Sequence, residues 1–308
     1  MRFIARLKGW PIDPLPKLSK AHKLTINTAF KALLSEWKFI LRDFPKANKL
    51  SNPALHLNRY KLILKDLKSF LARKNRKDSH DIKTKKINDD CPEYFKRNYH
   101  YQTDGYFTLD SAKRYDHQIE LLFLGTAHIM RKVAYSVLKP FLKSNASVLE
   151  FGAGSGTSGH QFKLLFPDIE LDLLDPSESY LAHAKSISPE TFNEYIPAFI
   201  ENFKSSKKYD CIYSCFVLHE IPVRHWDSMI QTLKDLLKEN GHILIIDSQQ
   251  NCDKIEHQFA LDQFAEDFYE PYFQEFREKS LVEYFEGHGF KLIEKKEVLF
   301  SKSLLFSL

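Results

Sequence analysis

The chain has 308 residues and a formal net charge of +5 at pH 7, and 43% of its residues are apolar and 28% are charged. This composition excludes a wholly disordered chain, and no uncharged apolar run reaches the length of about eighteen residues that a membrane span needs. The cysteines Cys91, Cys211, Cys215 and Cys252 form neither a CxxC pair nor a zinc pattern. Because the chain also starts without a signal-like apolar segment, we expect a reduced, cytoplasmic compartment.

The charge is distributed unevenly along the chain. Residues 1–90 hold 22 basic and 8 acidic residues, a net charge of +14, whereas the remainder holds 23 basic and 32 acidic residues, a net charge of −9. Three interpretations stay open: a solvated helical surface, a docking surface for nucleic acid or an anionic membrane, and internal pairing with the acidic segment 253–286.

The hydrophobic pattern predicts helices first and then alternating strands and helices. Amphipathic helices are expected over 19–44 and 54–73, an exposed linker over 73–90, and mostly helical structure over 109–142. Strands are expected at 147–151, 170–174, 195–200, 210–217, 241–247, 290–299 and 302–307. Helices are expected at 157–166, 177–187 and 224–239, with an acidic helical stretch over 253–287. This alternation indicates an α/β fold with a parallel sheet covered by helices on both faces.

A glycine-rich turn follows the first strand. Gly152, Gly154 and Gly156 allow a sharp turn and a close approach of ligand to the main chain, and the next helix begins with free N–H groups. About twenty residues later a second strand ends at Asp175, whose carboxylate can accept both hydroxyls of a ribose. Residues 154–159, GSGTSG, also match the G-x-G-x-x-G of dinucleotide binders, but that match starts late, and Glu150 would repel a pyrophosphate.

In these features the sequence resembles the class I S-adenosylmethionine-dependent methyltransferases over residues 146–308. The segments EFGAGSG (150–156), LDPSESYL (174–181), YDCIYSCFVLHEIP (209–222) and LLKENGHILIID (236–247) are similar to successive motifs of that family. The resemblance implies a Rossmann-like, doubly wound, seven-stranded, mostly parallel sheet with an antiparallel last strand, preceded by a helical N-terminal region. Together with the charge and hydrophobic patterns, it divides the chain into a basic helical region at 1–90, a helical cap or lid at 91–145, and the cofactor-binding domain at 146–308.

The resemblance also implies the cofactor and the residues that hold it. S-adenosylmethionine is expected as cofactor and S-adenosylhomocysteine as its product. Glu201 is the acid nearest to the position that often holds the adenine amino group. The expected cofactor-binding residues are Glu150, Gly152, Ala153, Gly154, Gly156, Asp175, Pro176, Tyr180, Glu201 and Phe216.

The end of the fourth strand carries the candidate catalytic residues. Ligands bind beyond the carboxyl ends of parallel strands, where His219 and Glu220 lie. Histidine suits proton removal near neutral pH, and the LHE step resembles the LHD step of O-methyltransferases whose histidine is the general base. We therefore expect His219 as general base, with Glu220 orienting it; a purely packing role for His219 is the alternative. In the cap, Tyr99, His100, Tyr106 and Tyr115 are expected to contact substrate or to form a lid.

The absence of several motifs limits the types of methyl transfer that the sequence predicts. The sequence lacks the Asp/Asn-Pro-Pro-aromatic signature of enzymes that methylate base amines and the Pro-Cys nucleophile of C5-pyrimidine enzymes, and no carboxylate cluster at the strand ends suggests a metal. The leading hypothesis is metal-independent methyl transfer to oxygen or carbon of a small molecule. The alternatives are a nucleic-acid or protein methyltransferase that docks through residues 1–90, and a non-catalytic cofactor-binding module.

Overall fold

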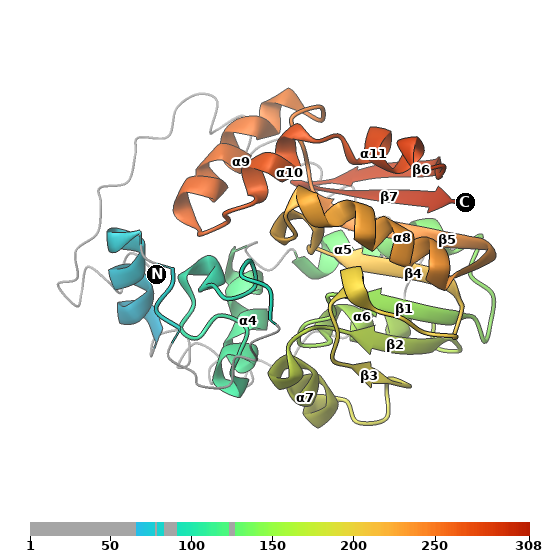
Figure 1. Ribbon diagram of the computed structural model, residues 1–308, viewed down its shortest axis with the longest axis horizontal. Helices are drawn as coiled ribbons and strands as arrows, with labels where there is room; N and C mark the ends of the chain where they lie inside the picture. Colours follow the sequence, from blue (N-terminus) through green and yellow to red (C-terminus); the bar gives the residue numbers. More distant parts are fainter. Residues whose placement is uncertain (1–65, 78, 83–90, 123–126) are drawn as a thin grey trace.

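The computed structural model describes residues 66–77, 79–82, 91–122 and 127–308, which form a sheet with flanking helices and a cap beside it (Figure 1). The helix expected over 19–44 lies outside these residues, as does most of the one over 54–73. Of the latter, residues 66–76 are helical.

The sheet has seven strands in the order β3-β2-β1-β4-β5-β7-β6. β1 pairs in parallel with β2 and β4, and β4 pairs in parallel with β5. β7, the last strand of the chain, runs antiparallel to both β5 and β6. This topology confirms the predicted Rossmann-like sheet with an antiparallel last strand. The strands are β1 Ser147–Phe151, β2 Glu170–Leu174, β3 Tyr195–Ile196, β4 Tyr209–Cys215, β5 Leu237–Ser248, β6 Lys291–Val298 and β7 Ser301–Ser307.

Helices cover both faces of the sheet because the buried strands alternate side chains between two apolar layers. On one face, Ile212 of β4 belongs to a cluster with Trp226 of α8 and Phe285 of α11. On the other face, Tyr213 packs with Phe162 of α6, their rings stacked 4.5 Å apart. The α-helices are α4 Leu109–Leu122, α5 Ala127–Tyr135, α6 Thr157–Leu165, α7 Glu178–Ile187, α8 Trp226–Leu236, α9 Ile255–Asp267, α10 Phe273–Glu278 and α11 Leu281–Gly287.

Several predicted boundaries are wrong, each because tertiary pairing overrides local propensity. The helix expected over 224–239 ends at Leu236, since Leu237 pairs with Tyr209 and a bulge at Asn240 (φ 60°) leads into the rest of β5. The strand expected over 195–200 shortens to β3, and Ile200–Asn202 forms a 3₁₀ turn, η4. Within the described ranges, no helix has the length and apolar character required to cross a bilayer.

Residues 66–77 and 79–82 contact the cap through several buried side chains. Arg73 is 4% exposed, and its guanidinium donates to Asp81 (2.5 Å) and to Thr103 (2.7 Å). The exposed linker predicted over 73–90 is therefore wrong at Arg73 and Ser79, which are buried, whereas residues 75–77 and His80 are exposed. The Lys74 ammonium pairs with Asp267 of α9 (2.6 Å), which is one instance of the internal pairing that the charge distribution suggested.

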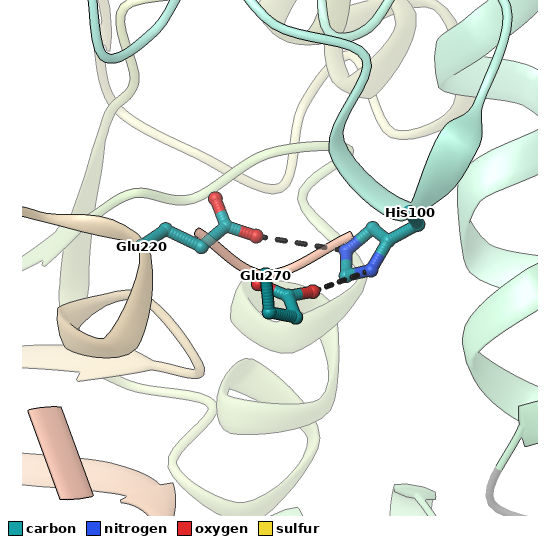
Figure 2. A group of neighbouring side chains, drawn as sticks. All are labelled: His100, Glu220 and Glu270. Carbon is teal, nitrogen blue, oxygen red and sulfur yellow. Dashed lines mark ion pairs between the residues drawn. The ribbon is translucent and has the colours of Figure 1, made fainter. Parts of the chain in front are cut away.

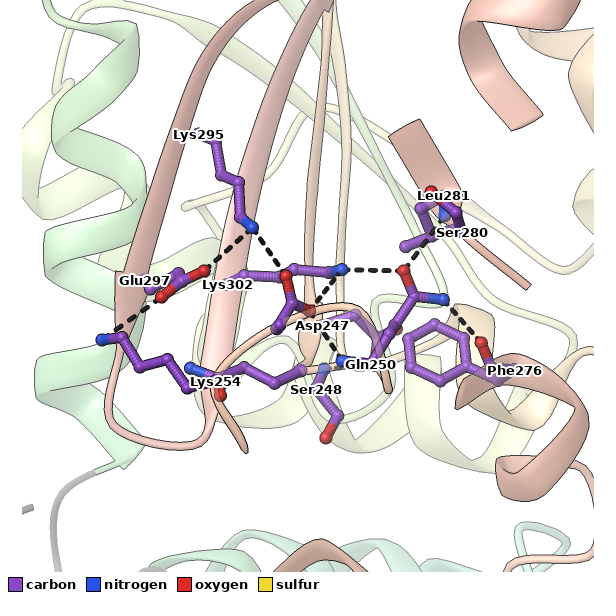
Figure 3. Close-up of polar contacts among 12 residues, drawn as sticks. Asp247, Ser248, Gln250, Lys254, Phe276, Ser280, Leu281, Lys295, Glu297 and Lys302 are labelled. Carbon is purple, nitrogen blue, oxygen red and sulfur yellow. Dashed lines mark hydrogen bonds and ion pairs between the residues drawn. The ribbon is translucent and has the colours of Figure 1, made fainter. Parts of the chain in front are cut away.

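The segment between β5 and β6 carries α9, α10 and α11, and a buried polar cluster anchors it (Figure 3). The Lys302 ammonium on β7 is 2% exposed and donates to Gln250 Oε1 (2.7 Å) and Asp253 Oδ2 (2.7 Å). The Gln250 amide donates to the Phe276 carbonyl, and its oxygen accepts from the Leu281 backbone N–H. This cluster positions α9 and α10 beside the carboxyl ends of the parallel strands.

Candidate active site

A cavity of about 760 Å³ lies at the carboxyl ends of β1, β2 and β4, between the sheet, the cap and α9. It is lined mostly by apolar and aromatic side chains. Of the residues predicted from the sequence, those that line it are Gly152, Ala153, Gly154, Asp175, Pro176, Tyr180, Glu201, Phe216, His219 and Glu220, and from the cap Tyr99, His100, Tyr106 and Tyr115.

The glycine turn has the left-handed backbone that its residues allow. Gly152, Gly154 and Gly156 have φ values of 65°, 53° and 76°. A Cβ on Gly152 would lie 2.4 Å from Val217 Cγ2, whereas a Cβ on Gly154 would meet nothing nearer than Tyr180 at 3.8 Å. Gly152 therefore lets the turn pack against the loop after β4, and Gly154 exposes main chain to the cavity.

Asp175 connects β2 to this turn. Its Oδ2 accepts the Gly154 backbone N–H (2.7 Å) and its Oδ1 accepts the Ser177 backbone N–H (2.8 Å). Burial raises the pKa of the Asp175 carboxyl to about 6, against the opposing effect of the two N–H donors. The carboxylate has further lone pairs and lines the cavity, so it could accept hydroxyl groups of a ligand there.

Glu150 and Gly156 lie behind the cavity wall, which differs from the direct cofactor contact expected of them. Glu150 is 1% exposed; its Oε2 accepts from the Tyr213 hydroxyl (2.9 Å) and lies 2.7 Å from where a Cβ on Gly159 would be. Burial raises the pKa of the Glu150 carboxyl to about 7. A Cβ on Gly156 would lie 2.9 Å from Ala184 Cβ, so this glycine lets the turn pack against α7. Both residues support the turn from outside the cavity.

Glu201, which the sequence predicts as a cofactor-binding residue, lines the cavity at the 3₁₀ turn after β3. Its Oε1 accepts a hydrogen bond from the Tyr94 hydroxyl (2.5 Å), and the side chain is buried. The Tyr180 ring lies nearby in the cavity wall and packs edge-on against Tyr106 (5.4 Å). Tyr94 and Tyr106 join the cap to this end of the site.

His219 is held by Asp247, which corrects the expectation that Glu220 orients it. His219 Nδ1 donates to Asp247 Oδ1 (2.6 Å), and Asp247 Oδ2 accepts the backbone N–H groups of Val217 and Leu218 (3.2 and 2.9 Å). Burial opposes the charged imidazole, but the Asp247 carboxylate, together with those of Glu270 and Glu220, raises the pKa of His219 to about 9. Asp247 therefore fixes the orientation of the His219 ring and favours its protonated form.

Glu220 instead contacts His100, whose other ring nitrogen contacts Glu270 (Figure 2). Glu220 Oε1 lies 3.6 Å from His100 Nε2, and Glu270 Oε1 lies 2.7 Å from His100 Nδ1. The Tyr106 hydroxyl donates to Glu220 Oε1 (2.6 Å). Burial opposes the charged imidazole of His100, but Glu270 and Glu220 raise its pKa to about 10. The three residues come from the cap, the loop after β4, and the α9–α10 connection.

The backbone at His100 is strained, which is common at functional sites. His100 and Tyr101 both have φ of 53°, in the left-handed region that non-glycine residues rarely occupy. The Tyr99 ring beside them stacks on Tyr106 (5.3 Å), and its hydroxyl donates to the Tyr94 carbonyl (2.7 Å). Tertiary contacts therefore hold the cap loop with the His100 ring at the cavity wall.

Sequence reasoning missed Arg131, Asp247, Glu270 and Tyr94. Arg131 of α5 lines the cavity and hydrogen-bonds to Cys215 at the end of β4. Asp247 could have been found from the sequence, because it lies at the carboxyl end of the strand expected at 241–247, next to the strand that precedes His219. Glu270 lies in a short connection without a motif, and no sequence pattern marks it.

Comparison with known proteins identifies the family. The profile of the family described as "Methyltransferase domain" matches residues 115–295, more than half of the chain. The chain belongs to this family, and it is a class I S-adenosylmethionine-dependent methyltransferase. The predicted enzyme class and cofactor are thereby confirmed.

Solved structures with a similar fold are distant in sequence. N-methyltransferase NodS from Bradyrhizobium japonicum WM9 is 12% identical, with 58% of this chain and 93% of that chain covered and a TM-score of 0.43. An S-adenosylmethionine-dependent methyltransferase from Clostridium acetobutylicum ATCC 824 is 13% identical, with 63% and 98% covered and a TM-score of 0.48. No curated protein sequence matches significantly.

Proposed function

We propose that this enzyme methylates a small-molecule acceptor bound in the cavity between sheet and cap. The observation that carries the proposal is the cavity itself. One space of about 760 Å³ joins the glycine turn and Asp175 to an aromatic cap, and this volume is in the range of about 300–1,000 Å³ that small-ligand sites occupy. The cap, residues 91–145, would enclose the acceptor, and residues 146–308 would form the cofactor-binding domain after the basic region 1–90.

The residues at the sheet end of the cavity fit S-adenosylmethionine. Asp175 would accept the ribose hydroxyls, and the exposed main chain at Gly154 would lie against the ligand, since space is open where its Cβ would be. Arg131 is a cation suited to the cofactor's carboxylate. Glu201 is an acceptor suited to the adenine amino group, with Pro176, Tyr180 and Phe216 as flanking apolar surface.

The residues around His219 would position the acceptor. The cofactor, when bound, supplies an activated methyl group on a sulfonium, so the protein's task is alignment and control of protons. His219, fixed by Asp247, presents its ring to the cavity as a hydrogen-bond donor at neutral pH. The general-base role predicted from the sequence would develop only as the pH approaches about 9, where the imidazole loses its proton.

Calorimetry tests the proposal. We expect S-adenosylmethionine and S-adenosylhomocysteine to bind the full-length protein and NAD not to bind; preferential binding of NAD would contradict the cofactor site. Incubation with labelled S-adenosylmethionine and host-extract fractions should label a small molecule. Labelled polynucleotide or protein, with steeply salt-dependent binding, would favour the docking alternative. Cofactor binding without transfer to any fraction would favour a non-catalytic module.

A further inference from the structure

The cluster of His100, Glu220 and Glu270 brings together three segments that are distant in sequence (Figure 2). Glu270 is buried behind the His100 ring, with its side chain 0% exposed. Glu220 lines the cavity, and its side chain is 17% exposed. The carboxylate that faces a ligand is therefore that of Glu220.

Two carboxylates flank one imidazole in the cluster, so a protonated His100 can pair its charge with only one of them. A protonated His100 balances one of the two carboxylates, and the shorter contact, 2.7 Å, assigns it to Glu270. The Tyr106 hydroxyl donates to Glu220 but carries no charge, since burial holds its pKa well above the ordinary value. The contacts of the Glu220 carboxylate with His100 and Tyr106 both use Oε1. Its Oε2 can therefore accept a hydrogen bond from a ligand. A half-buried carboxylate at a cavity wall favours a cationic ligand.

Aromatic rings surround the same point. Tyr99 and Tyr106 are stacked, and Tyr115 packs edge-on against Tyr106 (5.9 Å) and lies 6.2 Å from the His100 ring. All three tyrosines line the cavity. Ring faces attract cations, and organic ammonium groups are bound in this way.

A metal ion fits this arrangement less well. His100, Glu220 and Glu270 are metal-ligating residue types whose ligand atoms lie within 4.8 Å of one another. The two carboxylates, however, approach opposite nitrogens of one imidazole, Nε2 and Nδ1. A single ion could take a lone pair from only one of these nitrogens, so the three residues do not converge on one position.

We propose that the methyl acceptor is an amine carried on an apolar or aromatic body, bound as an ammonium by Glu220 among the aromatic rings of the cap. This assignment rests on the proposed function. It differs from the oxygen or carbon acceptor expected from the sequence. The Asp247 and Glu270 carboxylates each contact one of the two cavity histidines and raise its pKa, which favours an acceptor that needs no histidine base.

The reaction balances with these groups. The ammonium transfers one proton to the Glu220 carboxylate, which frees the nitrogen lone pair. That lone pair forms the new N–C bond to the methyl carbon while the C–S bond breaks, and its electron pair stays on sulfur. The products are the methylated ammonium and neutral S-adenosylhomocysteine, and Glu220 returns its proton to solvent.

Binding of a matched pair of probes tests the proposal without requiring turnover. The full-length protein is first saturated with S-adenosylhomocysteine. We then expect calorimetry to detect binding of phenethylamine, and binding of 2-phenylethanol with an affinity at least about tenfold lower. Glu220→Gln should lower the affinity for phenethylamine about 10- to 100-fold and leave the affinity for S-adenosylhomocysteine unchanged. Glu283→Gln, an exposed carboxylate on α11, is the matched control and should change neither.

The outcomes separate this proposal from the one on which it rests. Failure to bind S-adenosylhomocysteine would overturn the proposed function. If S-adenosylhomocysteine binds, then equal binding of the two probes, preference for the alcohol, or no binding of the amine would overturn the amine assignment alone. Stoichiometric binding of Zn²⁺ or Mn²⁺ that is lost in Glu220→Gln would overturn it in favour of a metal site.

Discussion

Alanine substitutions at Gly152 and Gly154 distinguish packing of the glycine turn from ligand contact. Both residues have positive φ, so each substitution carries a backbone cost of about 1–2 kcal/mol. Only at Gly152 does the new Cβ overlap a neighbour, Val217 Cγ2 at 2.4 Å, which adds about 1–3 kcal/mol for overpacking. We therefore expect Gly152→Ala to lower the free energy of unfolding by about 2–5 kcal/mol and Gly154→Ala by about 1–2 kcal/mol.

The order should reverse for cofactor affinity. A Cβ on Gly154 enters open space beside the cavity and would meet a bound ligand, so Gly154→Ala should weaken S-adenosylhomocysteine at least about tenfold, which is about 1.4 kcal/mol. Guanidinium unfolding and calorimetry measure the two quantities on the same preparations. If Gly152→Ala is as stable as Gly154→Ala, the packing of the turn against Val217 is wrong. If Gly154→Ala binds like the parent, the ligand does not lie against that main chain.

Three further substitutions test other contacts. Asp175→Ala should weaken the binding of S-adenosylhomocysteine by about 1.5–3 kcal/mol for each charge-assisted bond lost. The affinity of the parent should fall as the pH drops through about 6, because the Asp175 carboxyl then takes up a proton. Calorimetry at pH 5 and 7.5 checks both expectations. Asp247→Asn should lower the pKa of His219 from about 9, as read by NMR titration, and an unchanged pKa would refute the pairing. Because folding raises the pKa of His219, the His219–Asp247 pair stabilises the parent fully below pH 6.5, and this stabilisation is lost as the pH rises through about 9. The free energy of unfolding, measured across this range, should show the loss in the parent alone. Lys302→Met should cost about 3–5 kcal/mol in guanidinium unfolding, and a cost below 1 kcal/mol would show that the buried cluster does not anchor α9 and α10.

Local sequence patterns were sufficient for the strand and turn that build the cofactor end. The glycine turn follows a buried strand directly, and Asp175 ends the next strand, so backbone geometry alone brings them together at one edge of the sheet. Even here the side-chain direction of Glu150 was not predictable. A side chain next to the turn can point into the cavity or toward the helix beneath it. The hydrogen bond from the Tyr213 hydroxyl holds the Glu150 side chain on the helix side.

The acceptor end depends on contacts that no short-range pattern encodes. Hydrophobic periodicity placed His219 at the right edge of the sheet, but its partner Asp247 is 28 residues away on β5. His100, Glu220 and Glu270 meet because the cap folds over the sheet and the α9–α10 connection closes behind it. Periodicity reports which face of an element is buried, whereas the pairing of charges between elements depends on how whole layers pack, and that information exists only in the folded chain.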